Sequence, residues 1–511
     1  MQVEPAGWRW CERLLFITGS CVLVHPIFSS AYYFTVDGPS HVYTASLLIG
    51  QGAMENARLW EVNPLPVPNW TGHALLALMQ LVLAPTEALK VLHAIILLSF
   101  PITFRAWAIH RKARIPWTAH LAFPFGITSM FSMGFYNFCL GLPLFIGVIW
   151  AWERTSRNTF GSWVVLAVLL LVLYFTHMLP FGFAVAYLGV QAAMDLAYGL
   201  LRKDSIHVLL RRPLALALCL IPSLALLGIY MLCSPEQMTP GEGAAARWAL
   251  WRPYSITSSA AEVILWSGAV MCMLLILVLP GRGERNSGDV SGHPPRVYGL
   301  VAFSLVTVLL LACVPDTLGL GSDTVPRMMI LAHVWLLAIL PFHKPMRWVG
   351  VWVSVAAIGI TIGMESIRGA DRGGLSKRLR HCTELAASVP RGAVVATLHF
   401  NWWEAHVFDL GLAQRGVVHL SNYELIHDHF PLRWTSSVST TRTLAFGDPL
   451  DVLHPYSGVA GKLLREADHI LVVGQPTNDE QREHLQFMLD ELENSHHKGD
   501  SNESCWSLNR R

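Results

Sequence analysis

Charged side chains are scarce in this sequence: only 14% of its 511 residues are Asp, Glu, Lys or Arg, whereas 53% are hydrophobic. A soluble globular chain normally carries about 25% charged residues, so this deficit excludes an ordinary soluble protein and indicates a polytopic membrane protein. The 37 basic and 35 acidic residues leave a net charge of only +2. Because nucleic-acid binding needs a concentrated basic surface, we expect no nucleic-acid partner.

Several motifs of soluble enzymes are also missing. The sequence has no glycine-rich phosphate loop and no nucleophile elbow, which leaves nucleotide hydrolysis and serine-hydrolase chemistry without support. The nine cysteines show none of the Cys-x-x-Cys or Cys/His spacings of a zinc site, and no metal ligand is predicted. Seven cysteines lie in or beside apolar runs. The other two, Cys382 and Cys505, either form a disulfide or stay reduced.

Long apolar runs, by contrast, are abundant. The first extends from Leu14 to about Phe34 and, at about 20 residues, has the length of a membrane span rather than of a signal peptide. The run 73–84 is short: if it dips into the membrane without crossing, eleven spans remain, and if it crosses fully, every later orientation inverts or one loop breaks the charge rule. The ten that follow the first are predicted at roughly 86–108, 117–136, 138–153, 161–179, 180–200, 211–233, 259–280, 297–315, 326–342 and 347–364.

Lysine and arginine are unevenly distributed among the loops, and this bias predicts the orientation in the membrane. Connections with few basic residues are expected outside, and they are 35–72, 234–258 and 316–327. Connections with clustered basic residues are expected in the cytoplasm, and they lie near residues 105–114, 154–157, 202–212 and 282–296. With eleven spans, the N-terminus is then cytoplasmic and the C-terminus is outside.

The composition changes after Met364, where long apolar runs stop and charges become frequent. We therefore predict a transmembrane domain over 1–364 and an extracytoplasmic α/β domain over 365–511. The fold class is thus an α-helical polytopic membrane protein with a small C-terminal α/β soluble domain. Within that domain, strands are predicted at 392–398, 416–421 and 469–474, and helices at 375–388 and 478–494, the second capped by Asn478.

The stretch FTVDGPSHVYTA, residues 34–45, follows the first apolar run directly. Pro39 suits the first turn of a new helix that Asp37 or Gly38 would cap, and His41 would then lie one turn from Asp37. This stretch opens the loop 35–72, and loops of that length are usually functional. Asp37 is then either a helix cap only, with His41 an interfacial polar residue, or part of a site.

This arrangement resembles the GT-C superfamily of membrane glycosyltransferases, which includes protein O-mannosyltransferases, oligosaccharyltransferase and the enzymes that add aminoarabinose to lipid A. In those enzymes the first span delivers an acidic residue into a large extracytoplasmic loop. The resemblance implies transfer of a sugar from a polyprenyl-phosphate donor to an extracytoplasmic acceptor, with Asp37 as general base. Many members carry two acidic residues in this loop, whereas Gly38 follows Asp37 here, so the resemblance gives no certain cofactor and leaves a divalent metal in doubt.

A leaving lipid phosphate needs cationic or hydrogen-bonding partners. Arg327, at the predicted outer end of a span, is the first candidate, and its alternative role is that of a snorkelling interfacial arginine. Asn137 and His177 also lie at predicted outer ends of spans and are further candidates. The alternative for each is a polar side chain at a helix end whose hydrogen bonds are made to backbone groups. The full set of candidate substrate-binding residues is His41, Glu61, Asn69, His73, Asn137, His177, Arg247, Arg252 and Arg327.

Two C-terminal segments, 399–411 and 419–434, combine aromatic residues with His, Asn and Glu. That composition is typical of carbohydrate-facing surfaces and also of surfaces that dock onto a membrane. Two other functions stay open for the whole chain: a lipid or small-molecule transporter or flippase, and a non-catalytic protein that keeps a GT-C-like scaffold. In each case we expect an integral protein of the plasma (inner) membrane with its C-terminal domain outside.

Overall fold

The chain forms two compact units in the computed structural model. Unit 1 consists of Met1–Pro26, Ala94–Phe131 and Tyr136–Arg368, and unit 2 consists of Ile27–His93, Ser132–Phe135 and Gly369–Arg511. Unit 2 therefore joins the segment after the first apolar run to the C-terminal region that the composition set apart. The structure describes residues 6–50, 59–111, 115–155, 159–233, 259–278, 294–314, 323–340, 346–425, 427, 429–435, 467–501 and 504–511.

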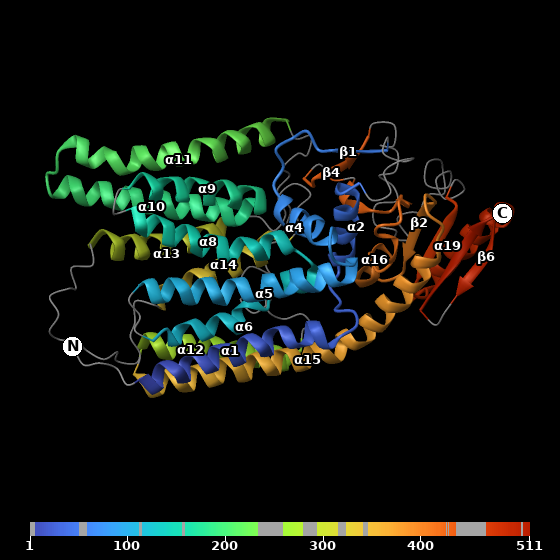
Figure 1. The fold of residues 1–511 in the computed structure, drawn as a ribbon, viewed down its shortest axis with the longest axis horizontal. Helices are drawn as coiled ribbons and strands as arrows, with labels where there is room; N and C mark the ends of the chain where they lie inside the picture. Colours follow the sequence, from blue (N-terminus) through green and yellow to red (C-terminus); the bar gives the residue numbers. More distant parts are fainter. Residues whose placement is uncertain are drawn as a thin grey trace. The chain divides into compact units, whose positions relative to one another are not determined.

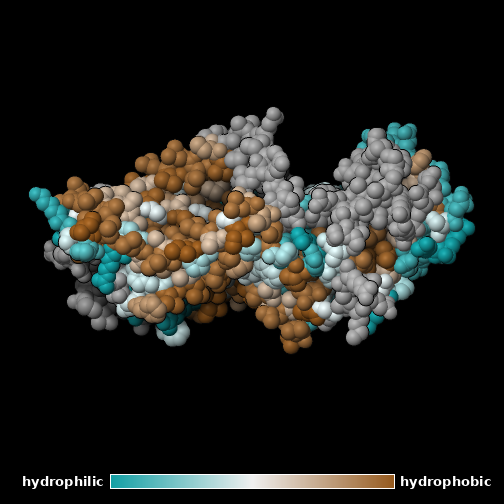
Figure 2. Space-filling model, turned by 90° about the horizontal axis from the view of Figure 1, so that it is seen from above, coloured by the Kyte–Doolittle hydropathy of each residue, from teal (hydrophilic) through white to brown (hydrophobic). Residues whose placement is uncertain are grey.

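Apolar helices make up most of unit 1, where they run side by side (Figure 1). Their outward faces carry apolar side chains, and brown residues cover much of the helical part in Figure 2. In the described residues, six helices are long and apolar enough to cross a membrane. They are α1 (Ala6–Ser29), α5 (Pro85–His110), α8 (Tyr136–Arg154), α10 (Met178–Leu201), α11 (Ile206–Cys233) and α15 (Arg347–Ser388).

Four shorter apolar helices accompany these six: α9 (Phe160–Thr176), α12 (Ala260–Val278), α13 (Pro294–Cys313) and α14 (Thr324–Ile339). All ten helices coincide with apolar runs in the sequence, so a helical membrane protein is confirmed. The prediction for 117–136 is wrong, because this run is broken into η1 (Trp117–Leu121), α6 (Ala122–Gly126) and α7 (Ser129–Met133). Pro124 removes a backbone donor inside the run, and the positive φ of 92° at Gly134 prevents α7 from continuing.

Helix α15 differs from the prediction in length. The last apolar run was expected to end at Met364 and a separate helix to form over 375–388, but a single helix of 42 residues covers both. The residues beyond Met364 include three glycines, which weaken a helix, but most of the others are good helix formers and no proline interrupts them. The change in composition after Met364 therefore does not coincide with the end of a helix.

Buried ion pairs connect helices within unit 1. The guanidinium of Arg105 on α5 donates to both carboxylate oxygens of Glu12 on α1, at 2.8 and 2.7 Å. The Nε of Arg368 on α15 lies 2.7 Å from Oε1 of Glu262 on α12, and both side chains are almost fully buried. A buried charge is tolerated when a partner of opposite sign neutralises it, so each pair fixes two helices in register.

A five-stranded sheet forms the C-terminal part of unit 2, with the strand order β3-β2-β5-β7-β6. Strand β2 (Val394–His399) pairs in parallel with β3 (Val418–His419) and β5 (His469–Val473), and these three coincide with the predicted strands. Strands β6 (His496–Ser501) and β7 (Cys505–Arg510) are antiparallel additions that the sequence analysis missed. Their polar sequences, HHKGDS and CWSLNR, lack the apolar runs that revealed the others.

Helix α19 (Asp479–Leu492) follows β5 and confirms the predicted helix and its cap. The side chain of Asn478 accepts a hydrogen bond of 2.8 Å from the backbone N–H of Gln481. Cys382 on α15 and Cys505 on β7 are both buried, and their side chains are hydrogen-bonded to one another. The reduced alternative for this pair is therefore the one that the structure adopts.

The N-terminal part of unit 2 packs against its C-terminal part. It contains α2 (Gly38–Leu48), α4 (Trp70–Gln80) and β1 (Trp60–Val62), and β1 pairs antiparallel with β4 (Leu432–Trp434). The hydroxyl of Tyr43 donates to the carbonyl of Val417 at 2.7 Å and accepts from the N–H of His419 at 3.1 Å. Residues more than 370 positions apart thus share one core, which places α2 beside the C-terminal segment.

We expect Glu262→Gln to destabilise the protein by about 3–5 kcal/mol, because it removes the carboxylate charge that faces the buried guanidinium of Arg368. The matched control is Glu87→Gln: Glu87 is exposed and pairs with Lys90 within one helix, a contact worth about 0.5 kcal/mol or less. Thermal unfolding of both variants in detergent provides the measurement. Equal midpoints for the two variants would contradict the assigned role of the Glu262–Arg368 pair.

Candidate functional site

Asp37 stands at the start of α2, where Gly38 and Pro39 begin the helix as predicted. Its backbone N–H donates to the carbonyl of Met133 at 3.0 Å, and its carbonyl accepts from the N–H of His41 at 3.0 Å. The carboxylate, however, makes no capping hydrogen bond, although Asp37 occupies the cap position. The interpretation that Asp37 is only a helix cap is therefore wrong, and its buried carboxylate has other partners.

Those partners come from the C-terminal segment. Nε2 of His406 lies 3.9 Å from Oδ1 of Asp37, and the hydroxyl of Tyr423 hydrogen-bonds to the same carboxylate. Burial raises the pKa of Asp37, while the imidazoles of His406 and His41 oppose the rise, and the net pKa stays above the ordinary value of 3.8. Asp37 is thus a carboxylate whose basicity exceeds that of an exposed aspartate.

A second buried carboxylate, Asp409 at the start of α16 (Asp409–Leu412), lies behind His406. Nδ1 of His406 is 3.6 Å from one oxygen of Asp409, and Nδ1 of His419 is 2.7 Å from the other. Burial would raise the pKa of Asp409, but the imidazoles of His419 and His406 outweigh it and hold the net pKa below its usual range. Burial lowers the pKa of His406, but the neighbouring carboxylates of Asp409 and Asp37 raise it by more, so its net pKa lies above the ordinary value. This favours an imidazolium between the two carboxylates.

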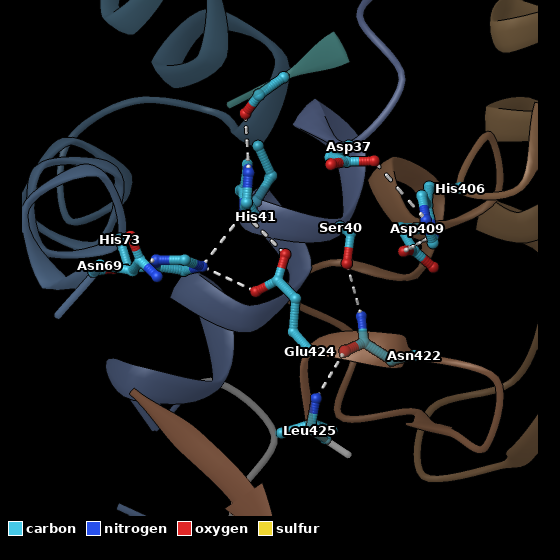
Figure 3. Close-up of polar contacts among 12 residues, drawn as sticks. Asp37, Ser40, His41, Asn69, His73, His406, Asp409, Asn422, Glu424 and Leu425 are labelled. Carbon is cyan, nitrogen blue, oxygen red and sulfur yellow. Dashed lines mark hydrogen bonds and ion pairs between the residues drawn. The ribbon is translucent and has the colours of Figure 1, made fainter. Parts of the chain in front are cut away.

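A third carboxylate, Glu424 in η7 (Tyr423–Leu425), is fully buried between two histidines (Figure 3). Its Oε1 lies 2.7 Å from Nδ1 of His41 on α2, and its Oε2 lies 2.7 Å from Nε2 of His73 on α4. The same two ring nitrogens are 3.2 Å apart. In the described part of the chain, these three side chains form a group whose ligand atoms all lie close enough together to bind a metal ion.

The opposite nitrogen of each ring in this cluster faces a backbone carbonyl. Nε2 of His41 is 2.9 Å from the carbonyl oxygen of Gly134, and Nδ1 of His73 is 3.1 Å from that of Asn69. Burial would raise the pKa of Glu424, but the imidazoles of His41 and His73 overcome this and hold the pKa well below its usual range. The Glu424 side chain is therefore a carboxylate, and both rings have a fixed orientation.

Several residues that the sequence singled out come together in unit 2. Asp37, His41 and His73 are buried close to one another, whereas Glu61 on β1 is exposed and pairs with Arg433 at 2.7 Å. Asn69 stands at the start of α4 with a left-handed φ of 71°, and its carbonyl is the acceptor for His73. Asn69 thus orients the ring of His73 through its backbone.

The remaining candidates belong to unit 1 or fall outside the described residues. Asn137 is buried in the first turn of α8, and Arg327 lies in the first turn of α14. The ring of His177 accepts a hydrogen bond of 3.1 Å from the N–H of Leu179 and caps α10, so its helix-end alternative is the one observed. Arg247 and Arg252 lie outside the described residues.

The sequence analysis did not single out the C-terminal partners of Asp37, His41 and His73. Those partners are His406, Asp409, His419, Tyr423 and Glu424. Both segments that hold them, 399–411 and 419–434, were noted for their mixture of aromatic and polar residues. That composition was the available signal, but it could not show that the polar side chains point inward.

Comparisons with known proteins give one result of note. No family model matches the chain, and no curated protein matches it. A solved structure, ArnT from Cupriavidus metallidurans bound to undecaprenyl phosphate, aligns with 97% of this chain and 97% of its own, at 13% identity and a TM-score of 0.42.

We expect Gly134→Ala to destabilise the protein by at least about 1–2 kcal/mol. Gly134 has a φ of 92°, and an added Cβ would lie 2.9 Å from the Cβ and the backbone nitrogen of Asp37. The control, Gly373→Ala, adds a methyl group in open space on helix α15 and should stabilise by about 0.5–1 kcal/mol. Thermal unfolding measures both, and a stabilising effect of Gly134→Ala would contradict the tight approach of Gly134 to Asp37.

Asp409→Asn should lower the free energy of unfolding by about 3–5 kcal/mol, because it removes the charge that the buried imidazoles of His406 and His419 face. The control is Glu384→Gln, which alters an exposed pair with Arg380 and should leave the midpoint unchanged. Chemical or thermal unfolding compares the two. If Asp409→Asn were as stable as the control, the buried network would contribute nothing to the fold.

Proposed function

We propose that this protein is a membrane glycosyltransferase that moves a sugar from a polyprenyl-phosphate donor to an extracytoplasmic acceptor. The observation that carries the proposal is the carboxylate of Asp37. It follows the first apolar helix, it is buried, its pKa is raised, and it makes no capping hydrogen bond. A carboxylate that is buried without a role in the helix cap is available for proton transfer.

The proposed reaction is a single displacement. A hydroxyl or amine of the acceptor attacks the anomeric carbon of the donor sugar, and the bond from that carbon to the phosphate oxygen breaks. The electron pair of this bond leaves with the lipid phosphate, and the proton of the acceptor passes to Asp37. A raised pKa suits this step, since general bases act best when their pKa approaches the working pH.

His406 and Tyr423 position the proposed base. The imidazolium of His406 favours the ionised form of Asp37 before the reaction, and the Tyr423 hydroxyl orients its carboxylate. Asp409 and His419 act one step further away, because they hold His406 in place and keep it charged. In this assignment Asp37 is the catalytic residue and the other four are positioning residues.

The lipid phosphate is assigned to Arg327, on the sequence argument that it lies at the outer end of a span. Guanidinium groups bind phosphate through two parallel hydrogen bonds and remain charged at all working pH values. The donor class itself comes from the sequence resemblance to the GT-C superfamily. Undecaprenyl phosphate in ArnT is a compound of the same class.

Native mass spectrometry of the protein in mild detergent tests the donor. Wild type and Asp37→Asn should retain a co-purified polyprenyl phosphate, and Arg327→Ala should lose it, because only the last variant removes the phosphate partner. Absence of such a lipid from wild type, even after the lipid is added back, would overturn the assignment of the donor. Retention by Arg327→Ala would overturn the role of Arg327 only.

Turnover tests the base. Release of polyprenyl phosphate from lipid-linked sugars, in the presence of cell-envelope extract as the acceptor source, should fall by about 10²–10⁴ in Asp37→Asn. Because the base acts when ionised, the wild-type rate should fall as the pH drops through a pKa above 3.8. The control is Asp479→Asn, an exposed aspartate on α19 that should keep full activity. Equal rates for the two variants would exclude Asp37 as the base.

A further inference from the structure

The cluster of His41, His73 and Glu424 carries an inference that does not depend on glycosyl transfer. Its three side chains come from α2, α4 and η7, at positions separated by 32 and 351 residues. All three are buried, and each ring turns one nitrogen toward an oxygen of the Glu424 carboxylate (Figure 3). Such convergence from separate elements needs a physical cause, because lone pairs that face one another in a buried place require a proton or a cation between them.

The outward hydrogen bonds decide which ring nitrogens carry protons. A carbonyl oxygen can only accept, so Nε2 of His41 donates to Gly134 and Nδ1 of His73 donates to Asn69. In a neutral imidazole the other nitrogen then bears a lone pair. The two inward nitrogens lie 3.2 Å apart, and each lies 2.7 Å from a different oxygen of the Glu424 carboxylate, so the three side chains turn lone pairs toward one another.

Positive charge must lie among these three groups to hold them together. One additional proton would neutralise Glu424 but could bridge only one of the two 2.7 Å nitrogen–oxygen contacts. Two additional protons would make both rings imidazolium, and their inward N–H groups would then face each other across 3.2 Å as buried like charges. A divalent cation supplies the same charge of +2 and accepts all three lone pairs. The carbonyl acceptors of Gly134 and Asn69 are then the outer partners that metal-binding histidines commonly have.

We propose that His41, His73 and Glu424 bind a zinc ion. Two imidazoles and one carboxylate form a ligand set used by catalytic zinc sites, which keep a fourth position for water or a substrate oxygen. Imidazole ligands favour zinc over magnesium and calcium, which take oxygen ligands. Tetrahedral zinc separates its ligand atoms by about 3.3 Å. The two ring nitrogens already lie 3.2 Å apart, and one ligand atom from each of the three residues lies within 4.8 Å of the others.

The proposed zinc ion joins the two sequence-distant parts of unit 2. Helices α2 and α4 lie in the segment Ile27–His93, and η7 lies in Gly369–Arg511. A ligand that binds only the folded state stabilises it, and here all three ligand groups are assembled only when these segments meet. Zinc removal should therefore lower the unfolding temperature of the protein.

Metal analysis of the purified protein provides the test. The chain is produced with an affinity tag that contains no histidine and is purified in detergent without chelator, and its zinc is measured by inductively coupled plasma mass spectrometry. Wild type should hold about one zinc per chain. Glu424→Gln and His73→Asn should bind zinc at least about 10-fold more weakly, since the loss of even an outer partner has effects of that size.

Asp409→Asn is the matched control. The substitution breaks another buried carboxylate–imidazole contact in the same unit. The variant protein should therefore be less stable than wild type and yet keep its zinc. Only variants that elute as a single species on size exclusion are compared. Loss of zinc in the Glu424 and His73 variants but not in the control supports the site, because general destabilisation would affect all three.

Cobalt substitution and chelation give independent measurements. Cobalt-loaded wild type should show the visible absorption of a four-coordinate ion, which Glu424→Gln should lack. Chelator should lower the unfolding temperature of wild type and leave that of Glu424→Gln unchanged. If wild type binds no zinc after reconstitution, or if folded Glu424→Gln and His73→Asn hold as much as wild type, the proposal is wrong and protons alone hold the cluster together.

Discussion

Attraction between buried carboxylates and imidazoles is the interaction on which unit 2 depends. Glu424 and Asp409 are both fully buried, and each faces two histidine rings. An isolated carboxylate would take up a proton rather than stay charged in such surroundings, and the removal of either partner leaves the other without compensation. The charges thus require one arrangement of α2, α4 and the C-terminal segment. Asp37 obtains its position and its raised pKa from that same arrangement.

Much of the fold follows from patterns within short stretches of sequence. Ten apolar runs became helices, three apolar stretches became strands, and Asn478 caps α19, because each of these depends on neighbouring residues only. The run 117–136 was misjudged because its hydropathy conceals the effect of Pro124 and the special backbone of Gly134. Strands β6 and β7 were missed because pairing, of β7 with β5 and of β6 with β7, rather than any apolar pattern, makes them strands.

The candidate site was predicted only in its N-terminal half. Asp37, His41 and His73 were identified from a loop that follows an apolar run, which is information local to that loop. Glu424 and its neighbours lie more than 350 residues further along the chain. No spacing rule for metal or catalytic motifs covers that separation, so the complete ligand set became visible only in three dimensions. From the sequence, the single Asp37 left a divalent metal in doubt, whereas the zinc ligands proposed from the structure are His41, His73 and Glu424.

The hydroxyl of Tyr43 bonds to backbone groups of Val417 and His419, and this contact has a consequence for biosynthesis. A chain emerging from the ribosome would present residues 27–93 long before their partners exist, since the contacts join positions more than 370 residues apart. The helices between them would have to enter the membrane first. During that interval the segment carries exposed apolar and ionisable groups that are buried only at the end. Assembly of unit 2 is therefore a late step of folding, with a large entropy of loop closure, and its precursor is a natural client for chaperones.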